Sequence, residues 1–179
     1  MKNDYAKAIK QVAWSLLITT FHLTIAGFDL LPAWVGYIMV YKALEPISRY
    51  QPTAKLLKPF AMVLIIDSII FWFLKPMGIT GGIYVINLIA AVIYIYLHFQ
   101  LLTDIYHTVE QFNMDSGGLI PVLRNITTVT YAIVFVTSNV GGNIYVMYAA
   151  GIVNIVMKVA LSLHLFDHGN NALETDMTI

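Results

Sequence analysis

The sequence predicts an all-α, polytopic transmembrane helical bundle of about six spans arranged as three hairpins. Three observations indicate this class: 59% of the 179 residues are hydrophobic, only 11% are charged, and the mean hydropathy is +0.74. A soluble domain has roughly 25% charged residues, so this chain has too little charge to cover a water-exposed globule of its size. The composition therefore excludes a soluble enzyme, a disordered chain and a nucleic-acid-binding domain.

Apolar stretches define the spans, because about 17–25 mostly apolar residues are needed to cross a bilayer. We expect spans at residues 8–28, 30–44, 56–74, 83–102, 119–138 and 144–166. The second stretch reaches only ~22 Å at 1.5 Å per residue, so it thins the bilayer locally, snorkels through Lys42 or forms a re-entrant arm. The first resembles a signal peptide at its start, but its apolar run is too long for one and contains His22, so we interpret it as a retained span. Residues 1–166 then form the bundle, and residues 167–179 a polar cytoplasmic tail.

The positive charges predict the orientation, because cytoplasmic loops carry an excess of lysine and arginine. Lys2, Lys7 and Lys10 precede the first span, whereas only Lys75 lies in a link on the opposite side. A second positive cluster surrounds the link between the second and third spans and comprises Lys42, Arg49, Lys55 and Lys58. We therefore expect both termini in the cytoplasm.

Polar side chains recur in four spans at steps of three and four residues, which places each set on one helical face. These stripes should face the protein interior, because a polar group in hydrocarbon is costly. Packing alone explains the small and hydroxyl residues, but it does not require ionisable ones. The stripes comprise Ser15, Thr19, His22 and Asp29; Asn87, Tyr94 and His98; Arg124, Thr128 and Tyr131; and Asn154, Lys158 and Ser162.

Two charges lie deepest, Asp67 in the third span and Lys158 in the sixth. An unpaired charge at that depth costs at least ~2.5–3.5 kcal/mol on insertion scales. We therefore expect an Asp67–Lys158 ion pair. Two interpretations of it remain open: a structural staple, and a pair that responds to a proton or a ligand.

The sequence gives candidate ligand-binding or ion-path residues but no catalytic motif, so we expect no enzyme. The candidates are Asp67, Lys158, His22, Asn87, Tyr94, His98, Arg124 and Asn154. No metal or cofactor is expected. His164 and His168 have a metal-compatible spacing, but Gly169 is expected to end their helix. His22 and His98 lie near opposite surfaces, which does not suit a haem.

The turn after the first span carries a local motif, Leu31-Pro32-Ala33-Trp34-Val35-Gly36-Tyr37-Ile38. This motif resembles a Leu-Pro-x-x-[Ile/Val]-Gly-Tyr-Ile pattern in small uncharacterised multi-span proteins of Gram-positive bacteria. The resemblance implies a bacterial cytoplasmic membrane and no known activity. Physically, Pro32 starts a helix and Gly36 allows close approach of a neighbouring helix. In size and span number alone, the chain is also similar to the substrate-binding subunits of energy-coupling-factor vitamin transporters.

Two functions follow as hypotheses. The first is an integral membrane protein with a polar-lined interior that binds or transports a small-molecule solute of unknown identity, with or without a partner membrane subunit. The second is a non-catalytic structural or regulatory membrane subunit that acts through a protein partner. Both place the chain in contact with the lipid bilayer, and neither involves nucleic acid.

Overall fold

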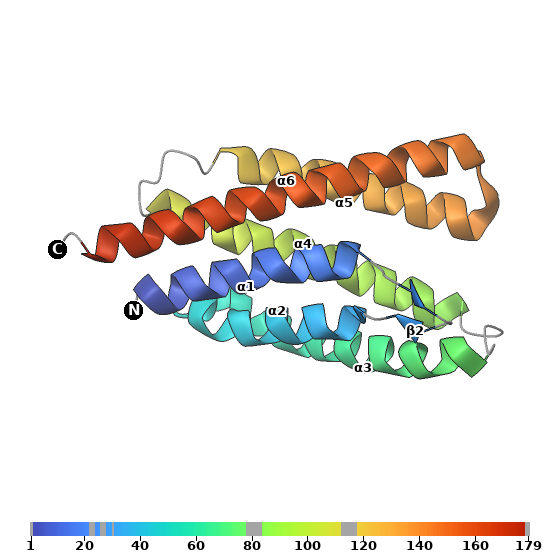
Figure 1. Ribbon diagram of the computed structural model, residues 1–179, viewed down its shortest axis with the longest axis horizontal. Coiled ribbons are helices and arrows are strands. Elements are labelled where there is room, and N and C mark those ends of the chain that lie inside the picture. The colour runs from blue at the N-terminus through green and yellow to red at the C-terminus, as the bar shows by residue number, and fades with distance from the viewer. Residues whose placement is uncertain are drawn as a thin grey trace.

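Six α-helices dominate the computed structural model, which describes residues 2–21, 24–25, 28–29, 31–77, 84–111 and 118–177 (Figure 1). The predicted all-helical class is confirmed. Short elements join the helices: the 3₁₀ helices η1 (Pro52–Leu57) and η2 (Lys75–Met77), the π-helical turn η3 (Thr137–Gly141), and the paired two-residue strands β1 (Thr24–Ile25) and β2 (Phe28–Asp29). The helices are α1 (Lys2–Thr20), α2 (Ala33–Ser48), α3 (Lys58–Leu74), α4 (Tyr84–Gln111), α5 (Leu119–Val136) and α6 (Ile144–Met177).

Four segments of the described chain are long and apolar enough to cross a membrane. They are Pro52–Met77, Val85–Gln111, Leu119–Gly141 and Ile144–Ala172. Their outer faces expose large apolar side chains, such as Ile70, Val92, Val129 and Ile152, each at least half exposed. A water-soluble protein buries such residues, so these four helices are compatible with an integral membrane protein.

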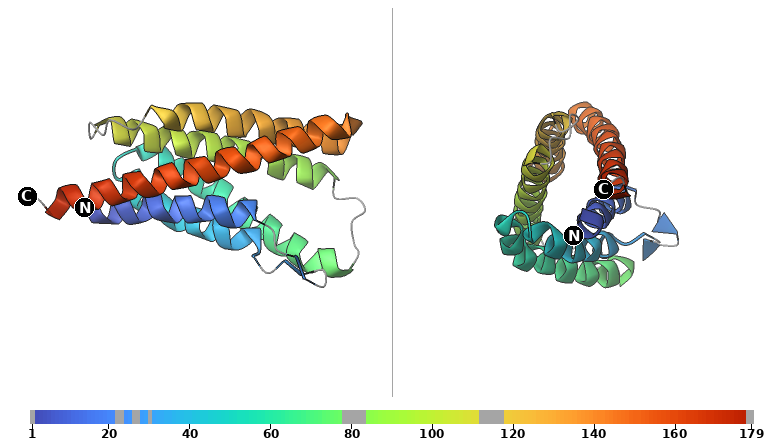
Figure 2. Two further views of the ribbon diagram at one scale, coloured as in Figure 1. Left: turned by 45° about the horizontal axis from the view of Figure 1, so that its top comes forward. Right: turned by 90° about the vertical axis from the view of Figure 1, so that its left-hand side faces the viewer.

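The helices form a closed ring in sequence order. Each packs against the next one along the chain, and α1 closes the ring by packing against α6. Figure 2 shows this ring in its end-on view, with α4 and α5 on one side, α6 and α1 on the other, and α2 and α3 between them. Both termini lie at the same end (Figure 1).

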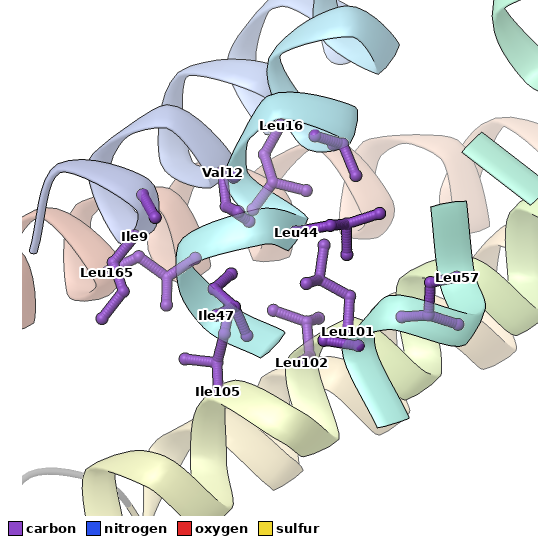
Figure 3. Packing of buried hydrophobic residues seen from close by; sticks show 14 of the residues in the cluster. Ile9, Val12, Leu16, Leu44, Ile47, Leu57, Leu101, Leu102, Ile105 and Leu165 are labelled. Carbon is purple, nitrogen blue, oxygen red and sulfur yellow. The ribbon is translucent and has the colours of Figure 1, made fainter. Parts of the chain in front are cut away.

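Apolar side chains fill the half of the ring near the termini (Figure 3). Ile9 and Val12 of α1 meet Leu44 of α2 and Leu102 and Ile105 of α4, and all five are at most 1% exposed. α4 therefore extends across the interior toward α1 and α2 as well as contacting its ring neighbours.

The first helix is shorter than the predicted span of residues 8–28. α1 ends at Thr20, and the chain then forms the β1–β2 pair, in which Thr24 opposes Asp29 and Ile25 opposes Phe28. The β-branched run Ile18-Thr19-Thr20 disfavours further helix. The second helix is also displaced from the predicted residues 30–44. It begins directly after Pro32 and has 16 residues. Neither α1 nor α2 is among the four segments that are long and apolar enough to cross a membrane.

The predicted polar tail is helical, which corrects the expectation that Gly169 ends the sixth span. α6 continues to Met177, and it lies against α1. A Cβ atom on Gly169 would lie 2.8 Å from Lys10 Cγ and 3.2 Å from the Ala6 carbonyl oxygen. Glycine at this position therefore lets the two helices approach closely instead of breaking the helix.

Gly36 plays the same role between α1 and α2, as its sequence context predicts. A Cβ atom there would lie 2.6 Å from Thr19 Cγ2 and 3.1 Å from the Ser15 carbonyl oxygen. These two contacts fix how closely α2 lies against α1. The first helical hairpin therefore presents Tyr37 to the ring interior from a defined position.

Candidate functional site

A cavity of about 250 Å³ occupies the ring interior toward the end opposite the termini. It lies between α2, α3, α4 and α5, with η3 at its rim. Most of the surface that lines it is polar, in contrast to the apolar core at the other end. The lining residues are Tyr37, Leu64, Asp67, Asn87, Ala90, Ala91, Tyr94, Tyr131, Phe135 and Asn139.

Helical spacing explains why these side chains share one cavity. On α4, Asn87, Ala91 and Tyr94 follow steps of four and three and so lie on one face. On α5, Tyr131 leads one turn at a time through Phe135 to Asn139 in η3. Parts of the predicted stripes of the fourth and fifth spans therefore line one cavity.

Asp67 is the one carboxylate among the described lining residues. Its side chain is half-buried. Within the part of the chain that the structure describes, it makes neither a hydrogen bond nor an ion pair. A partly desolvated carboxylate without a protein partner gains from any cation or hydrogen-bond donor that enters the cavity.

Tyr94 lies at the centre of an aromatic cluster. Its ring centroid is 4.6 Å from that of Tyr131, 6.3 Å from that of Tyr37 and 5.6 Å from that of His98, on which it stacks. Tyr94 is 8% exposed, and its hydroxyl has no hydrogen-bond partner among the described residues. A buried hydroxyl without a partner is costly, and this cost accompanies the packing of Tyr94 among its aromatic neighbours.

Lys158 does not form the expected ion pair with Asp67, which corrects the sequence-based prediction. The reason is the order of the ring: α3 packs against α2 and α4, whereas α6 packs against α1 and α5. The Lys158 ammonium instead lies 5.3 Å from the ring centroid of Tyr94 and 5.7 Å from that of Tyr131. Both distances suit cation–π contacts, which are strongest away from water. Lys158 is 6% exposed, so it faces the interior as predicted.

His98 borders a second, smaller cavity of about 20 Å³ between α1, α2 and α4. Tyr37 and Tyr94 line both cavities and therefore form the wall between them. The His98 Nε2 atom is buried without a hydrogen-bond partner in the described structure. A volume of this size suffices for one water molecule.

Two further candidates serve helix packing. Asn154 of α6 donates through Nδ2 to the Thr127 carbonyl oxygen at 2.8 Å and to Thr130 Oγ1 at 2.9 Å, which joins α6 to α5. Arg124 donates through Nη1 to Thr103 Oγ1 at 2.5 Å and covers the Phe99 ring at 4.0 Å, which joins α5 to α4. These contacts account for both side chains without a ligand.

The remaining histidines do not extend the site. His22 lies outside the described residues. His164 and His168 share the continuous helix α6, with their Nε2 atoms 3.3 Å apart. Among the residues that the structure describes, no group of three or more carboxylate or imidazole side chains is placed to hold a metal ion.

The structure therefore brings three candidates, Asp67, Asn87 and Tyr94, into one cavity and places Lys158 and His98 beside the ring of Tyr94. The prediction omitted Tyr37, Tyr131 and Asn139 from the site. A signal for Tyr131 existed in the predicted stripe of the fifth span. Asn139 lies eight residues further along the same face but was assigned to the link, because the π-helical turn that extends α5 was not foreseen.

Comparisons of the chain with protein-family models, with curated proteins and with solved structures found no match. The functional argument therefore depends on the geometry of the site alone.

Proposed function

We propose that the protein is a six-span protein of a bacterial cytoplasmic membrane with both termini in the cytoplasm. At 1.5 Å per residue, α1 spans ~28 Å and α2 ~24 Å, against a hydrocarbon core of ~30 Å. The ring supports membrane placement of both helices, because α1 lies between α6 and α2, and α2 between α1 and α3. The excess of positive charge at the ends of α1 and α2 near the termini supports the orientation. The bacterial assignment depends on the local motif at residues 31–38 and stays a prediction.

Within this bundle, we propose that the cavity binds a small solute and that the protein is of the solute-binding or transport type. One observation carries the proposal: a polar cavity of about 250 Å³ lies among helices whose outer faces are apolar. Polar and ionisable residues inside a membrane bundle are costly, and they typically line solute or ion pathways. The Asp67 carboxylate and the Asn87 side-chain amide lie in the lining of this concave site and supply polar groups to it.

The alternative function is a structural or regulatory subunit that acts through a membrane partner. That function requires no cavity, and a filled polar interior would suit it better. The half-buried Asp67 carboxylate, which lines the cavity without a partner among the described residues, favours the solute-binding proposal, because a purely structural core satisfies its buried polar groups.

Ligand-dependent thermal stabilisation of the purified protein tests the proposal. A panel of amino acids, amines, sugars, nucleosides and carboxylates is added at millimolar concentration. A solute present at one hundred times its Kd stabilises by ~2.7 kcal/mol, which raises Tm by about 5–10 °C in a chain of this length.

Two matched variants locate the effect. Ala90→Leu adds bulk to the cavity wall and should abolish the shift, whereas Ala149→Leu adds the same bulk to an exposed position on α6 and should leave it intact. If no solute shifts Tm, or if Ala90→Leu retains the shift, the solute-binding proposal is wrong.

A further inference from the structure

We propose that the cavity selects a small organic cation, an amine or a quaternary ammonium compound. This inference depends on the proposed solute-binding function and names the class of ligand. It follows from three properties of the cavity wall: its charge, its aromatic rings and its hydrogen-bonding groups.

The charge of the wall favours a cation. Asp67 lines the cavity, and no lysine, arginine or histidine is among its described lining residues. The Lys158 ammonium group lies 5.3 and 5.7 Å from the ring centroids of Tyr94 and Tyr131, but Lys158 is not itself among the lining residues. An anionic ligand would therefore meet the Asp67 carboxylate and no cationic side chain in the described lining.

Aromatic rings form much of the rest of the wall. Tyr37, Tyr94, Tyr131 and Phe135 line the cavity from α2, α4 and α5. Aromatic faces attract ammonium groups within about 6 Å of the ring centroid, and several rings around one carboxylate are a typical environment for such ligands. The contact of Lys158 with two of these rings indicates that they already stabilise an ammonium group in this fold.

The polar groups of the wall can accept hydrogen bonds from an amine. Asp67 supplies carboxylate oxygens to the lining, and Asn87 supplies an amide oxygen. The volume of about 250 Å³ is below the ~300–1,000 Å³ typical of sites for drug-sized ligands, so the organic cation is a small one.

Thiol labelling tests the inference, because the chain contains no cysteine. Asn139→Cys places a single thiol at the cavity rim, and Val140→Cys places one at the next position, which is 72% exposed and not part of the lining. Each variant reacts with a cationic trimethylammonium-ethyl and with an anionic sulfonatoethyl methanethiosulfonate reagent. The ratio of cationic to anionic labelling rates at residue 139 is divided by the same ratio at residue 140. This corrected ratio removes the difference in intrinsic reactivity between the two reagents.

At residue 139, the corrected ratio should favour the cationic reagent by about tenfold, at the lower end of the range for charge focusing in clefts. Adding Asp67→Asn should bring the ratio close to one, whereas Asp67→Glu should retain the preference. Tetramethylammonium chloride should slow labelling at residue 139 more than sodium chloride at equal ionic strength. The comparison of the two salts is made in Asn139→Cys with Asp67 unchanged, so it does not depend on the stability of an Asp67 variant.

The outcomes separate the two proposals. If neither reagent labels Asn139→Cys while both label Val140→Cys, the cavity is closed to solutes and the proposed function fails. If both reagents label residue 139 without a cationic preference, or if tetramethylammonium gives no specific protection, the cavity is accessible but the cation inference is wrong. A preference that survives Asp67→Asn also overturns it, because the carboxylate is then not its source.

Discussion

The contact between Gly36 and α1 predicts that a single methyl group destabilises the first hairpin. In Gly36→Ala, the new Cβ would lie 2.6 Å from Thr19 Cγ2 and 3.1 Å from the Ser15 carbonyl oxygen. Carbon atoms pack best at about 3.5–4.0 Å, so the helices must separate by roughly 0.9 Å or the Thr19 side chain must move. Overpacking of this kind costs ~1–3 kcal/mol, which lowers Tm by about 2–12 °C in a chain of this length.

A double-mutant cycle isolates the contact. Thr19→Ser removes Cγ2 and keeps the hydroxyl, which donates to the Ser15 carbonyl oxygen at 2.8 Å. In the Gly36→Ala background, Thr19→Ser should recover more than half of the lost Tm, although the carbonyl contact at 3.1 Å prevents full recovery. Gly118→Ala is the matched control, because no atom lies within 4 Å of its Cβ position.

Thermal unfolding of the purified variants, followed by tryptophan fluorescence, measures these differences. The packing argument is refuted if Gly36→Ala is as stable as the parent chain. It is also refuted if Thr19→Ser fails to rescue the variant, or if Gly118→Ala loses as much stability.

Three other perturbations have defined outcomes. Asn154→Leu removes hydrogen bonds between α5 and α6 and should cost ~0.6–1.7 kcal/mol, measured as a lower Tm. Glu45→Gln removes an exposed ion pair with Lys58, so its small Tm loss should disappear at high salt. The hydrogen bond and charge of Lys58 lower the pKa of Glu45 from 4.5, so the stabilisation by this ion pair is fully present above pH 4.5. The stabilisation is lost as the pH falls through the lowered pKa of Glu45, and the Tm values of the parent chain and of Glu45→Gln should then converge. Gly169→Leu should lower Tm by forcing α6 away from Lys10, whereas a frayed tail would show no change.

The sequence was sufficient to predict the helical class and several inward-facing side chains, because both follow from local patterns; Asn87, which the same pattern placed inside, is exposed. Charge-poor composition and apolar runs indicate membrane helices. The step of three and four residues places Tyr94, Asn154 and Lys158 in the interior, where each is at most 8% exposed. Periodicity determines the face of a helix on which a residue lies, and this face can be predicted without knowing which helices are neighbours.

The sequence was insufficient to predict which helices are neighbours. The pairing of Asp67 with Lys158 assumed that the third and sixth helices lie side by side, but each packs against its neighbours in the ring instead. The same limitation concealed the end of the sixth helix. Gly169 resembles a helix terminator locally, and only its contact with Lys10 and Ala6 shows that it is a packing position.

The ring also places the two ends of the chain at the same end of the bundle, with α1 beside α6 (Figure 1). Since every helix pairs with the ones before and after it, a linker from α6 to α1 would complete a cyclic backbone without changing any interface. Circular permutation then becomes feasible: new ends could be opened after α2 or α4, on the side where the original ends lie. Such rearranged chains would allow fluorescent or affinity modules to be attached at several points around the bundle while the interior is preserved.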